Sequence, residues 1–554
     1  MVVLRGAASA AGFVLALLLA SGGQAEPQKI AALEVEQAGP AAEADPVLSP
    51  AILALKTAIE RLPAGAAQDK TLAAELRKLY EGRAFEPLWI RDGAPTAQAQ
   101  ALVDHLAAAE DEGLRPEEYA VPDLAASDLA STERVATAEV ELSRAIARFV
   151  LHVAAGKADP ASISKHITVA PPRPNLADAL SKLADDEDAR ALMRRFAPPH
   201  PQYAALRDKL AELRRQKVEE TVTVVPDGRS LRLGDSDPRV ALLRERLGLE
   251  ADADADAELF DEGLAEAVSA FQREHRLTAD GIVGPRTLLA LNGPSREEAI
   301  AAIQVNMERL RWLPRDLGAF HVMVNVPEFQ LRIVKNDRPV HETRVIVGTK
   351  TNPTPTFSNA IDHLIVNPYW NVPASILTKE MLPEIQRDPY YFARHNYQVL
   401  AHWEGKTYVV DPMMVDWNRV DTSILRVRQL PGEANALGRI KFMFPNQHAV
   451  YLHDTPTKHL FKRDFRAYSH GCVRVDDPMA FADALLAHEP EWNAAALQKY
   501  FGGPERRINL NRQVPVHLAY FTARVTDDGK LVTFADLYGY DSQVRQQLGL
   551  AESM

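Results

Sequence analysis

Hydrophobic residues recur at helical spacing through the first part of the chain, from Ser49 to Lys217. In the stretch ELSRAIARFVLHVAAG the apolar residues fall on one face of a helix, and Gly156 provides a stop. These apolar residues are Leu142, Ile146, Phe149, Val150 and Val153. Proline-containing breaks separate this helix from its neighbours. The pattern predicts an α-helical domain over residues 49–230, and no catalytic motif is visible within it.

A second helical pattern covers residues 231–293 and is short enough for a small module. Pro238 opens the first helix, in SDPRVALLRERLG. The stretch LAEAVSAFQREHRL predicts a second helix, and GPRTLLAL predicts a third after a glycine-punctuated turn. Phe271 and Leu277 fit the buried spacing of the second helix. We expect three short helices here, followed by a connecting helix over residues 294–315.

After the connecting helix the periodicity changes from helical to alternating. The stretches AFHVMVNVPEFQLRIV, TRVIVGT, NAIDHLIVNPYW and QHAVYLHDT are typical of strands. We expect a mostly β domain over residues 316–535, with a hairpin around Asp528 and Gly529. Residues 371–441 interrupt the strands with helical and aromatic-rich sequence, which predicts an inserted lid or binding element. Residues 536–554 remain as a C-terminal tail. The fold class is multidomain α+β.

The N-terminus carries the pattern of an export signal. Arg5 precedes an apolar run that is too short to span a bilayer, and Gly23 and Ala25 suit cleavage after Ala25. Residues 26–48 are rich in Ala, Glu and Pro without periodicity, which predicts a flexible linker. The sequence therefore predicts a signal peptide over residues 1–25 and a mature protein in the periplasm, peripheral to the membrane. An uncleaved signal that anchors the chain is the alternative.

Composition and charge exclude several functions. The formal net charge of −12 argues against nucleic acid as a partner, because phosphates require neutralisation by Lys and Arg. A hydrophobic fraction of 46% is ample for packed cores. The single cysteine cannot form an intramolecular disulfide, so packing alone must stabilise the fold.

That cysteine, Cys472, lies in the stretch YSHGCVR. An unpaired thiol outside the cytosol is open to oxidation, yet a lone cysteine is most often a small buried hydrophobic residue. The neighbouring residues favour a chemical role instead. A nucleophilic thiol needs a nearby base, and His453 at the end of a predicted strand is the candidate. In an extended segment His470 projects to the same side as Cys472. Gly471 allows close backbone approach, so we expect the N–H groups of Gly471 and Cys472 to face an oxyanion.

Two other interpretations remain open at this point. His453, His459, His470 and Cys472 are residue types that ligate zinc, which favours a metalloenzyme as one alternative. The second alternative is a non-catalytic scaffold in which the module at residues 231–293 performs the function by binding. A metal-binding protein and a scaffold predict different consequences for loss of the thiol.

The motifs around Cys472 resemble those of a known family. The stretch YLHDTP followed by SHGCVR is similar to the signature of the L,D-transpeptidase catalytic domain of the YkuD type. Upstream, VNVPEFQLRIV, TRVIVGTKTNPTPTF and IVNPYWNVP resemble strands of that domain. The pattern AVSAFQREHRLTADGIVGPRTLLAL resembles the three-helix peptidoglycan-binding module. Together with the helical region and the insertion, the chain resembles the large YcbB-like branch of the family.

The resemblance implies a role for each residue of the two motifs. Cys472 is the nucleophile, His453 is the general base, and the backbone carbonyl of Asp454 orients the imidazole. His470 and Gly471 frame the nucleophile. The substrate-binding residues that the resemblance implies are Ser469, Arg474, Tyr451, Trp370 and Asn367.

The resemblance also implies a reaction without a metal or another cofactor. Cys472 attacks the third residue of a peptidoglycan tetrapeptide stem, D-alanine leaves, and the side-chain amine of another stem resolves the thioester into a 3→3 cross-link. Water as acceptor gives an L,D-carboxypeptidase, and attachment of a wall protein or exchange of a D-amino acid uses the same site. The implied partners are stem peptides and other cell-wall synthesis proteins. Carbapenems are expected to acylate Cys472.

Overall fold

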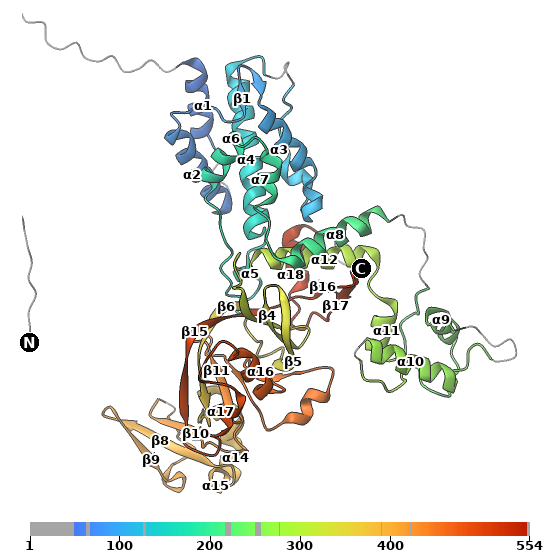
Figure 1. Cartoon of the computed structure of the whole chain (residues 1–554), viewed down its shortest axis with the longest axis vertical. Helices are drawn as coiled ribbons and strands as arrows, with labels where there is room; N and C mark the ends of the chain where they lie inside the picture. Colours follow the sequence, from blue (N-terminus) through green and yellow to red (C-terminus); the bar gives the residue numbers. More distant parts are fainter. Residues whose placement is uncertain are drawn as a thin grey trace, which may run out of the picture. The chain divides into compact units, whose positions relative to one another are not determined.

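The computed structural model describes residues 49–62, 67–125, 129–216, 223–249, 256–275, 277–388, 390–421 and 423–550. The predicted signal peptide and linker lie outside these residues. Within the described ranges, no helix is long and apolar enough to cross a membrane. A helical region, a small three-helix module and a β-rich domain make up this part of the chain, as the alternation of helical and strand periodicity predicts (Figure 1).

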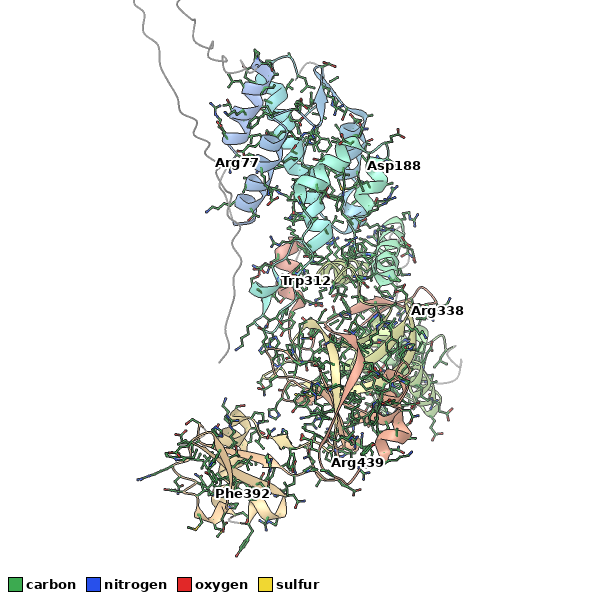
Figure 2. The ribbon with its side chains drawn as sticks, turned by 60° about the vertical axis from the view of Figure 1, so that its left-hand side comes forward. Arg77, Asp188, Trp312, Arg338, Phe392 and Arg439 are labelled. Carbon is green, nitrogen blue, oxygen red and sulfur yellow. The ribbon has the colours of Figure 1, made fainter. Side chains whose placement is uncertain are left out.

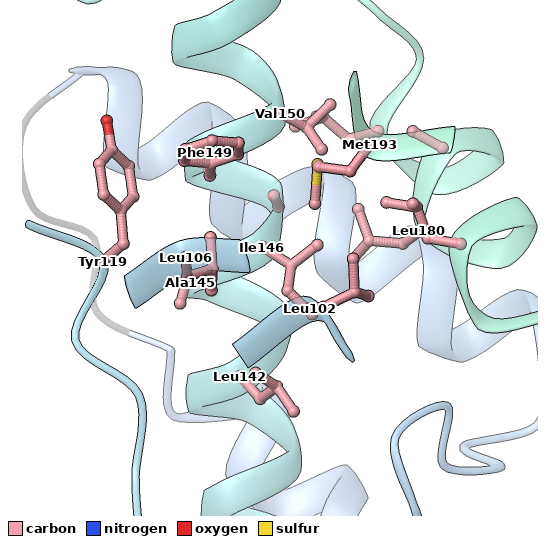
Figure 3. Packing of buried hydrophobic residues seen from close by; sticks show 14 of the residues in the cluster. Leu102, Leu106, Tyr119, Leu142, Ala145, Ile146, Phe149, Val150, Leu180 and Met193 are labelled. Carbon is pink, nitrogen blue, oxygen red and sulfur yellow. The ribbon is translucent and has the colours of Figure 1, made fainter. Parts of the chain in front are cut away.

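The helical region surrounds α4 (Thr132–Ala155), a helix of 24 residues that ends at Gly156, where φ is 88°. The apolar face predicted from its sequence is buried in the core (Figure 3): Leu142, Ile146, Phe149, Val150 and Val153. The other elements of this region are α1 (Pro50–Glu60), α2 (Ala67–Gly82), β1 (Ile90–Arg91), β2 (Ala94–Pro95), α3 (Ala97–Ala107), α5 (Pro160–Ile163), α6 (Leu176–Asp185), α7 (Ala189–Arg194) and α8 (Pro201–Arg215).

The module contains the three predicted helices, α9 (Arg239–Arg246), α10 (Glu262–Glu274) and α11 (Pro285–Asn292). They share a small core of their own, to which Phe260 and Val268 contribute. Phe271 packs against this core, as its spacing predicts. The side-chain amide of Gln272 is buried and donates to Asp280 and Thr287, which ties the glycine-containing turn to α10.

Helix α12 (Arg296–Arg311) begins at a capping box formed by Ser295 and Glu298. It is more than a connector, because Ile303 and Met307 lie in the core of the helical region. The C-terminal residues, expected as a tail, instead form α18 (Asp541–Leu548). Val544 and Leu548 of this helix are buried in the core of the β-rich domain.

The β-rich domain is a nine-stranded sheet in the order β13-β5-β14-β12-β11-β6-β15-β3-β4. Strand β4 also pairs with β5, so the sheet closes on itself and most of its strand edges are covered. The bounds are β3 (Phe320–Asn325), β4 (Gln330–Lys335), β5 (Arg338–Gly348), β6 (Phe357–Val366), β11 (Ile440–Met443), β12 (Leu452–His453), β13 (Ala467–Ser469), β14 (Val473–Val475) and β15 (Arg506–Ala519).

Smaller elements complete this domain. Helices α16 (Pro478–Leu485) and α17 (Ala494–Gln498) follow β14, and a 3-10 turn spans Lys458–Lys462. Strands β16 (Ala523–Val525) and β17 (Leu531–Thr533) form the predicted hairpin around Asp528 and Gly529.

The insertion folds as a small unit with its own core. Its four-stranded sheet has the order β7-β10-β8-β9, and Val399, Val427 and Phe392 are buried in its core (Figure 2). Its elements are β7 (Trp370–Asn371), α13 (Ala374–Ile376), the π-helical segment Leu377–Met381, α14 (Leu382–Arg387), α15 (Tyr391–Arg394), β8 (Tyr397–Trp403), β9 (Lys406–Val410) and β10 (Leu425–Gln429). The predicted end of the insertion at Lys441 is wrong, because Ile440 already begins β11 of the main sheet.

Candidate active site

His453 ends strand β12, and Cys472 immediately precedes the neighbouring strand β14 of the main sheet. Strands β12 and β14 run parallel, with His453 opposite Arg474 and Leu452 opposite Val473. The backbone N–H of Val473 donates to the carbonyl of Tyr451 over 3.2 Å, so Cys472 follows the same register beside Tyr451. Alternate residues of a strand point to the same face. The side chains of Tyr451, His453, Cys472 and Arg474 therefore share one face of the sheet.

The opposite face of these strands is hydrophobic. Phe442, Leu452 and Val473 are buried at 0%, 0% and 1% exposure in the core of the β-rich domain. Burial of these residues fixes the register, because a shift by one position would turn the core residues outward. The core therefore holds Cys472 and His453 on the other face.

The imidazole of His453 is held in one orientation. Its Nδ1–H donates to the backbone carbonyl of Asp454 over 2.5 Å, as the resemblance implies. The carboxylate of Asp454 is itself anchored, because it accepts from the N–H groups of Arg439 (2.9 Å) and Thr455 (2.7 Å) and pairs with Lys458. With Nδ1 protonated, Nε2 is left as the proton acceptor.

The protonation states of this pair follow from burial. Burial lowers the pKa of His453 to about 3, and the cationic Arg474 lowers this pKa further while the Asp454 carbonyl opposes the change. Burial raises the pKa of the Cys472 thiol to about 11. Hydrogen bonds from Tyr451 oppose this rise, as do the charges of Arg474 and Lys441. At neutral pH the free site therefore holds a thiol beside a neutral imidazole.

A tight loop presents Cys472. Gly471 has φ 109°, a conformation that favours glycine, and its carbonyl accepts from Thr354 Oγ1 over 2.8 Å. The N–H of Gly471 donates to Ser469 Oγ over 3.1 Å, and Ser469 Oγ in turn donates to the Cys472 carbonyl. The expectation that the Gly471 N–H faces an oxyanion is therefore wrong. Within the described chain, the N–H of Cys472 has no acceptor and remains available.

Ser469 and His470 do not have the environments that the sequence predicted for them. Ser469 is 2% exposed and its hydroxyl serves the loop, so it is not open to a substrate. The expectation that His470 projects beside the thiol is wrong, because the conformation of Gly471 breaks the strand alternation. The Nε2 atom of His470 instead lies 2.7 Å from the carboxylate of Glu380 in the insertion.

Two of the predicted substrate-binding residues have structural roles. Asn367 is 4% exposed, its amide donates to the carbonyls of Tyr500 and Pro504, and its Oδ1 accepts from the N–H of Gly502. Every polar atom of this side chain thus holds the loop before β15. Trp370 packs in the core of the insertion. Tyr451 and Arg474, by contrast, lie beside Cys472 and His453.

Lys441, which no motif in the sequence singled out, lies on the same face of the sheet as His453 and Cys472. It is opposite His453 in the pairing of β11 with β12, and its ammonium lies 5.6 Å from the centre of the Tyr451 ring. The alternation in RIKFMF, with Ile440, Phe442 and Phe444 buried, is a strand signal that identifies this position.

The side chains that suggested zinc are not brought together. Of the described residues, no three from His, Cys, Asp and Glu lie close enough to hold a metal ion. His453 uses Nδ1 for Asp454, and His470 contacts Glu380. The geometry fits covalent catalysis by a thiol with a neighbouring base.

Comparison with known families agrees with this geometry. Residues 319–495 match the L,D-transpeptidase catalytic domain of the YkuD family. Residues 74–210 match a family described as "Scaffold domain", and residues 238–291 match one described as "Putative peptidoglycan binding domain". The chain thus contains an L,D-transpeptidase catalytic domain of the YkuD type, together with a scaffold domain and a peptidoglycan-binding domain.

Individual relatives match over part of their length. A Haemophilus influenzae protein described as "Putative L,D-transpeptidase" is 38% identical over 251 residues, which is 44% of this chain and 48% of that protein. The match therefore spans about half the length of this relative. A solved L,D-transpeptidase from Mycobacterium smegmatis matches with TM-score 0.18 and 10% identity over 36% of this chain and 58% of that chain. One from Enterococcus faecium matches with TM-score 0.15 and 12% identity over 36% and 50%.

Proposed function

We propose that this protein is an L,D-transpeptidase that forms 3→3 cross-links in peptidoglycan, with a tetrapeptide stem as acyl donor. The observation that carries the proposal is the placement of Cys472 and the oriented imidazole of His453 on one face of two paired strands. The predicted export signal and the peptidoglycan-binding domain at residues 238–291 support a periplasmic site of action at the wall.

The first half of the reaction forms a thioester. The proton of Cys472 Sγ moves to Nε2 of His453 as the sulfur attacks the carbonyl carbon between the third and fourth residues of the donor stem. The N–H of Cys472 is the backbone donor for the resulting oxyanion. Collapse of the tetrahedral intermediate breaks the amide bond, and the imidazolium of His453 gives its proton to the departing amine of D-alanine.

The second half transfers the acyl group. The side-chain amine of a diamino acid on another stem attacks the thioester and loses a proton to His453. The imidazolium of His453 then gives this proton to the Cys472 sulfur as the carbon–sulfur bond breaks. The new amide bond links two third residues. If water attacks instead, the same site releases a tripeptide, and the enzyme is an L,D-carboxypeptidase.

Two features support binding of the donor by Arg474 and the insertion. Arg474 donates through Nη1 to Thr457 over 3.2 Å, while its buried Nε atom has no partner among the described residues. A donor stem carries carboxylates that suit such a guanidinium. Glu380 of the insertion reaches His470 next to the nucleophile loop, which supports a role of the insertion as a lid over the donor.

The proposed function is tested with purified mature protein and disaccharide-tetrapeptides. We expect cross-linked dimers and released D-alanine, detected by mass spectrometry of the muropeptides. Tripeptides without dimers would instead show an L,D-carboxypeptidase. Release of neither product would contradict the proposal, since the neutral thiol–imidazole pair is present without any added cofactor.

The protonation states predict an unusually flat pH profile. A pKa of about 3 for His453 means that the base is lost only in strong acid, and a pKa of about 11 for Cys472 means that the thiol persists into strong alkali. We therefore expect the rate constant for acylation by a carbapenem to vary less than about threefold between about pH 5 and pH 9. Rates of adduct formation by intact-protein mass spectrometry test this. A limb with a midpoint near pH 6 to 7 would show a thiolate–imidazolium pair instead.

A further inference from the structure

A row of side chains crosses the sheet beside the nucleophile. Arg474 of β14 pairs with His453 of β12, and His453 pairs with Lys441 of β11. Paired residues of adjacent strands point to the same face, and neighbouring strands lie about 4.8 Å apart. His453 is therefore flanked by a cation on each side, Arg474 on the strand of Cys472 and Lys441 on the far side.

Among the described residues, the ammonium of Lys441 forms no ion pair with an anionic side chain. The side chain is part-buried, and its ammonium lies over the Tyr451 ring, 5.6 Å from the ring centre. Throughout the described residues, no acceptor lies within hydrogen-bond distance of its Nζ atom. The carboxylate of Glu505 and the ionised form of Cys472 act on it only through space, and Glu505 accepts instead from the N–H of Tyr369. A cation in partial burial without an acceptor is unfavourable unless a ligand supplies one.

The direction of the leaving group is set by the two reacting residues. The acyl carbon is bonded to Cys472 Sγ, and the departing amine must reach Nε2 of His453 to receive its proton. Strands β14, β12 and β11 are adjacent in this order, and Lys441 of β11 lies opposite His453 of β12. The part of the donor beyond the amine therefore extends from His453 towards Lys441. In a tetrapeptide donor that part is a single D-alanine, which ends in a carboxylate. Arg474 lies on the strand of the nucleophile and faces the acyl side.

We propose that Lys441 binds the terminal carboxylate of the departing D-alanine and is thereby the residue that selects a tetrapeptide as donor. This inference rests on the proposed function and adds the specificity determinant to it. A donor with a fifth residue places an amide at this point, which leaves the ammonium unpaired. The charge of Lys441 is retained throughout the reaction, because the proton transfers involve only Cys472, His453 and the amines.

The test compares two donors on one enzyme. The donors are a synthetic tetrapeptide stem with a free terminal carboxylate and the same peptide with a terminal carboxamide, and the readout is the rate of acyl-enzyme formation by intact-protein mass spectrometry. For the wild-type protein we expect the carboxylate donor to react about tenfold faster, as for one charged hydrogen bond. For Lys441→Met we expect the two rates to agree within about twofold. The ratio is insensitive to changes in thiol reactivity, because these affect both donors equally.

Two further variants complete the comparison. Lys441→Arg keeps the charge and should retain most of the preference for the carboxylate. Lys335→Met, which removes an exposed lysine on β4, should retain all of it. A wild-type protein without preference, or a Lys441→Met variant that keeps the wild-type ratio, would overturn the assignment to Lys441 while leaving the transpeptidase proposal in place. If the wild-type protein is acylated by neither donor, the proposed function itself fails and the assignment falls with it.

Discussion

Replacing Cys472 with alanine is expected to abolish cross-linking and acyl-enzyme formation while the protein remains folded. A thioester requires a cysteine sulfur, and Cys472 is the single cysteine of the sequence. We therefore expect the rate to fall by about 10⁴- to 10⁶-fold, the range for removal of a catalytic nucleophile. The fold should persist, because the packing around the site comes from Leu452 and Val473 on the opposite face of the strands.

The measurement uses a carbapenem and a tetrapeptide stem as two independent acyl donors. Intact-protein mass spectrometry should show a single adduct on the wild-type protein with each donor and none on Cys472→Ala. A thermal unfolding midpoint close to that of the wild type confirms that the variant is folded. Adduct formation that persists in Cys472→Ala would place the nucleophile elsewhere, and retained cellular function would favour the non-catalytic scaffold.

Replacing His453 with alanine should slow acylation by about 10²- to 10⁴-fold, the range for loss of a general base. The reason is the raised pKa of Cys472, about 11, which leaves almost no thiolate at neutral pH unless a base accepts the proton. The residual rate of the variant should rise with pH up to about pH 11, about tenfold per unit, because only the fraction already ionised can react.

The matched control is His459→Ala. His459 follows six residues later, is exposed, and lies in the 3-10 turn Lys458–Lys462. Its replacement should leave the acylation rate and the flat pH profile unchanged. A large loss in His459→Ala, or a His453→Ala variant with a wild-type rate and flat profile, would contradict the assignment of the base.

Much of the fold follows from periodicity in the sequence. The five apolar residues of ELSRAIARFVLHVAAG lie on the buried face of α4, because a spacing of three and four residues leaves a helix only one way to bury them. The three helices of the module and the hairpin at Asp528 follow from similar local signals. Such patterns are local, so they can be interpreted without knowledge of which segments meet.

The boundaries and side-chain partners were less predictable. The insertion was expected to run to Lys441, because the strand pattern is interrupted from Asn371 to that residue. Lys441 belongs to the main sheet only because β11 pairs with both β6 and β12, and such a pairing depends on strands far apart in the sequence. The family resemblance implied that Asn367 contacts substrate, and its true partners could not be predicted because the loop around Tyr500 that occupies its amide is distant along the chain.

The sequence by itself was enough to predict the reacting groups. The single cysteine, the histidine 19 residues earlier and the Ser-His-Gly-Cys motif predict a nucleophile and a base, and the family match over residues 319–495 agrees with the class of chemistry. The tertiary structure alone decided how these groups are used. The parallel pairing of β12 with β14 places Cys472 and His453 on one face, the Asp454 carbonyl sets the tautomer, and φ 109° at Gly471 turns His470 towards Glu380. Each of these depends on hydrogen bonds and burial that arise when separate strands meet, and residue spacing does not encode them.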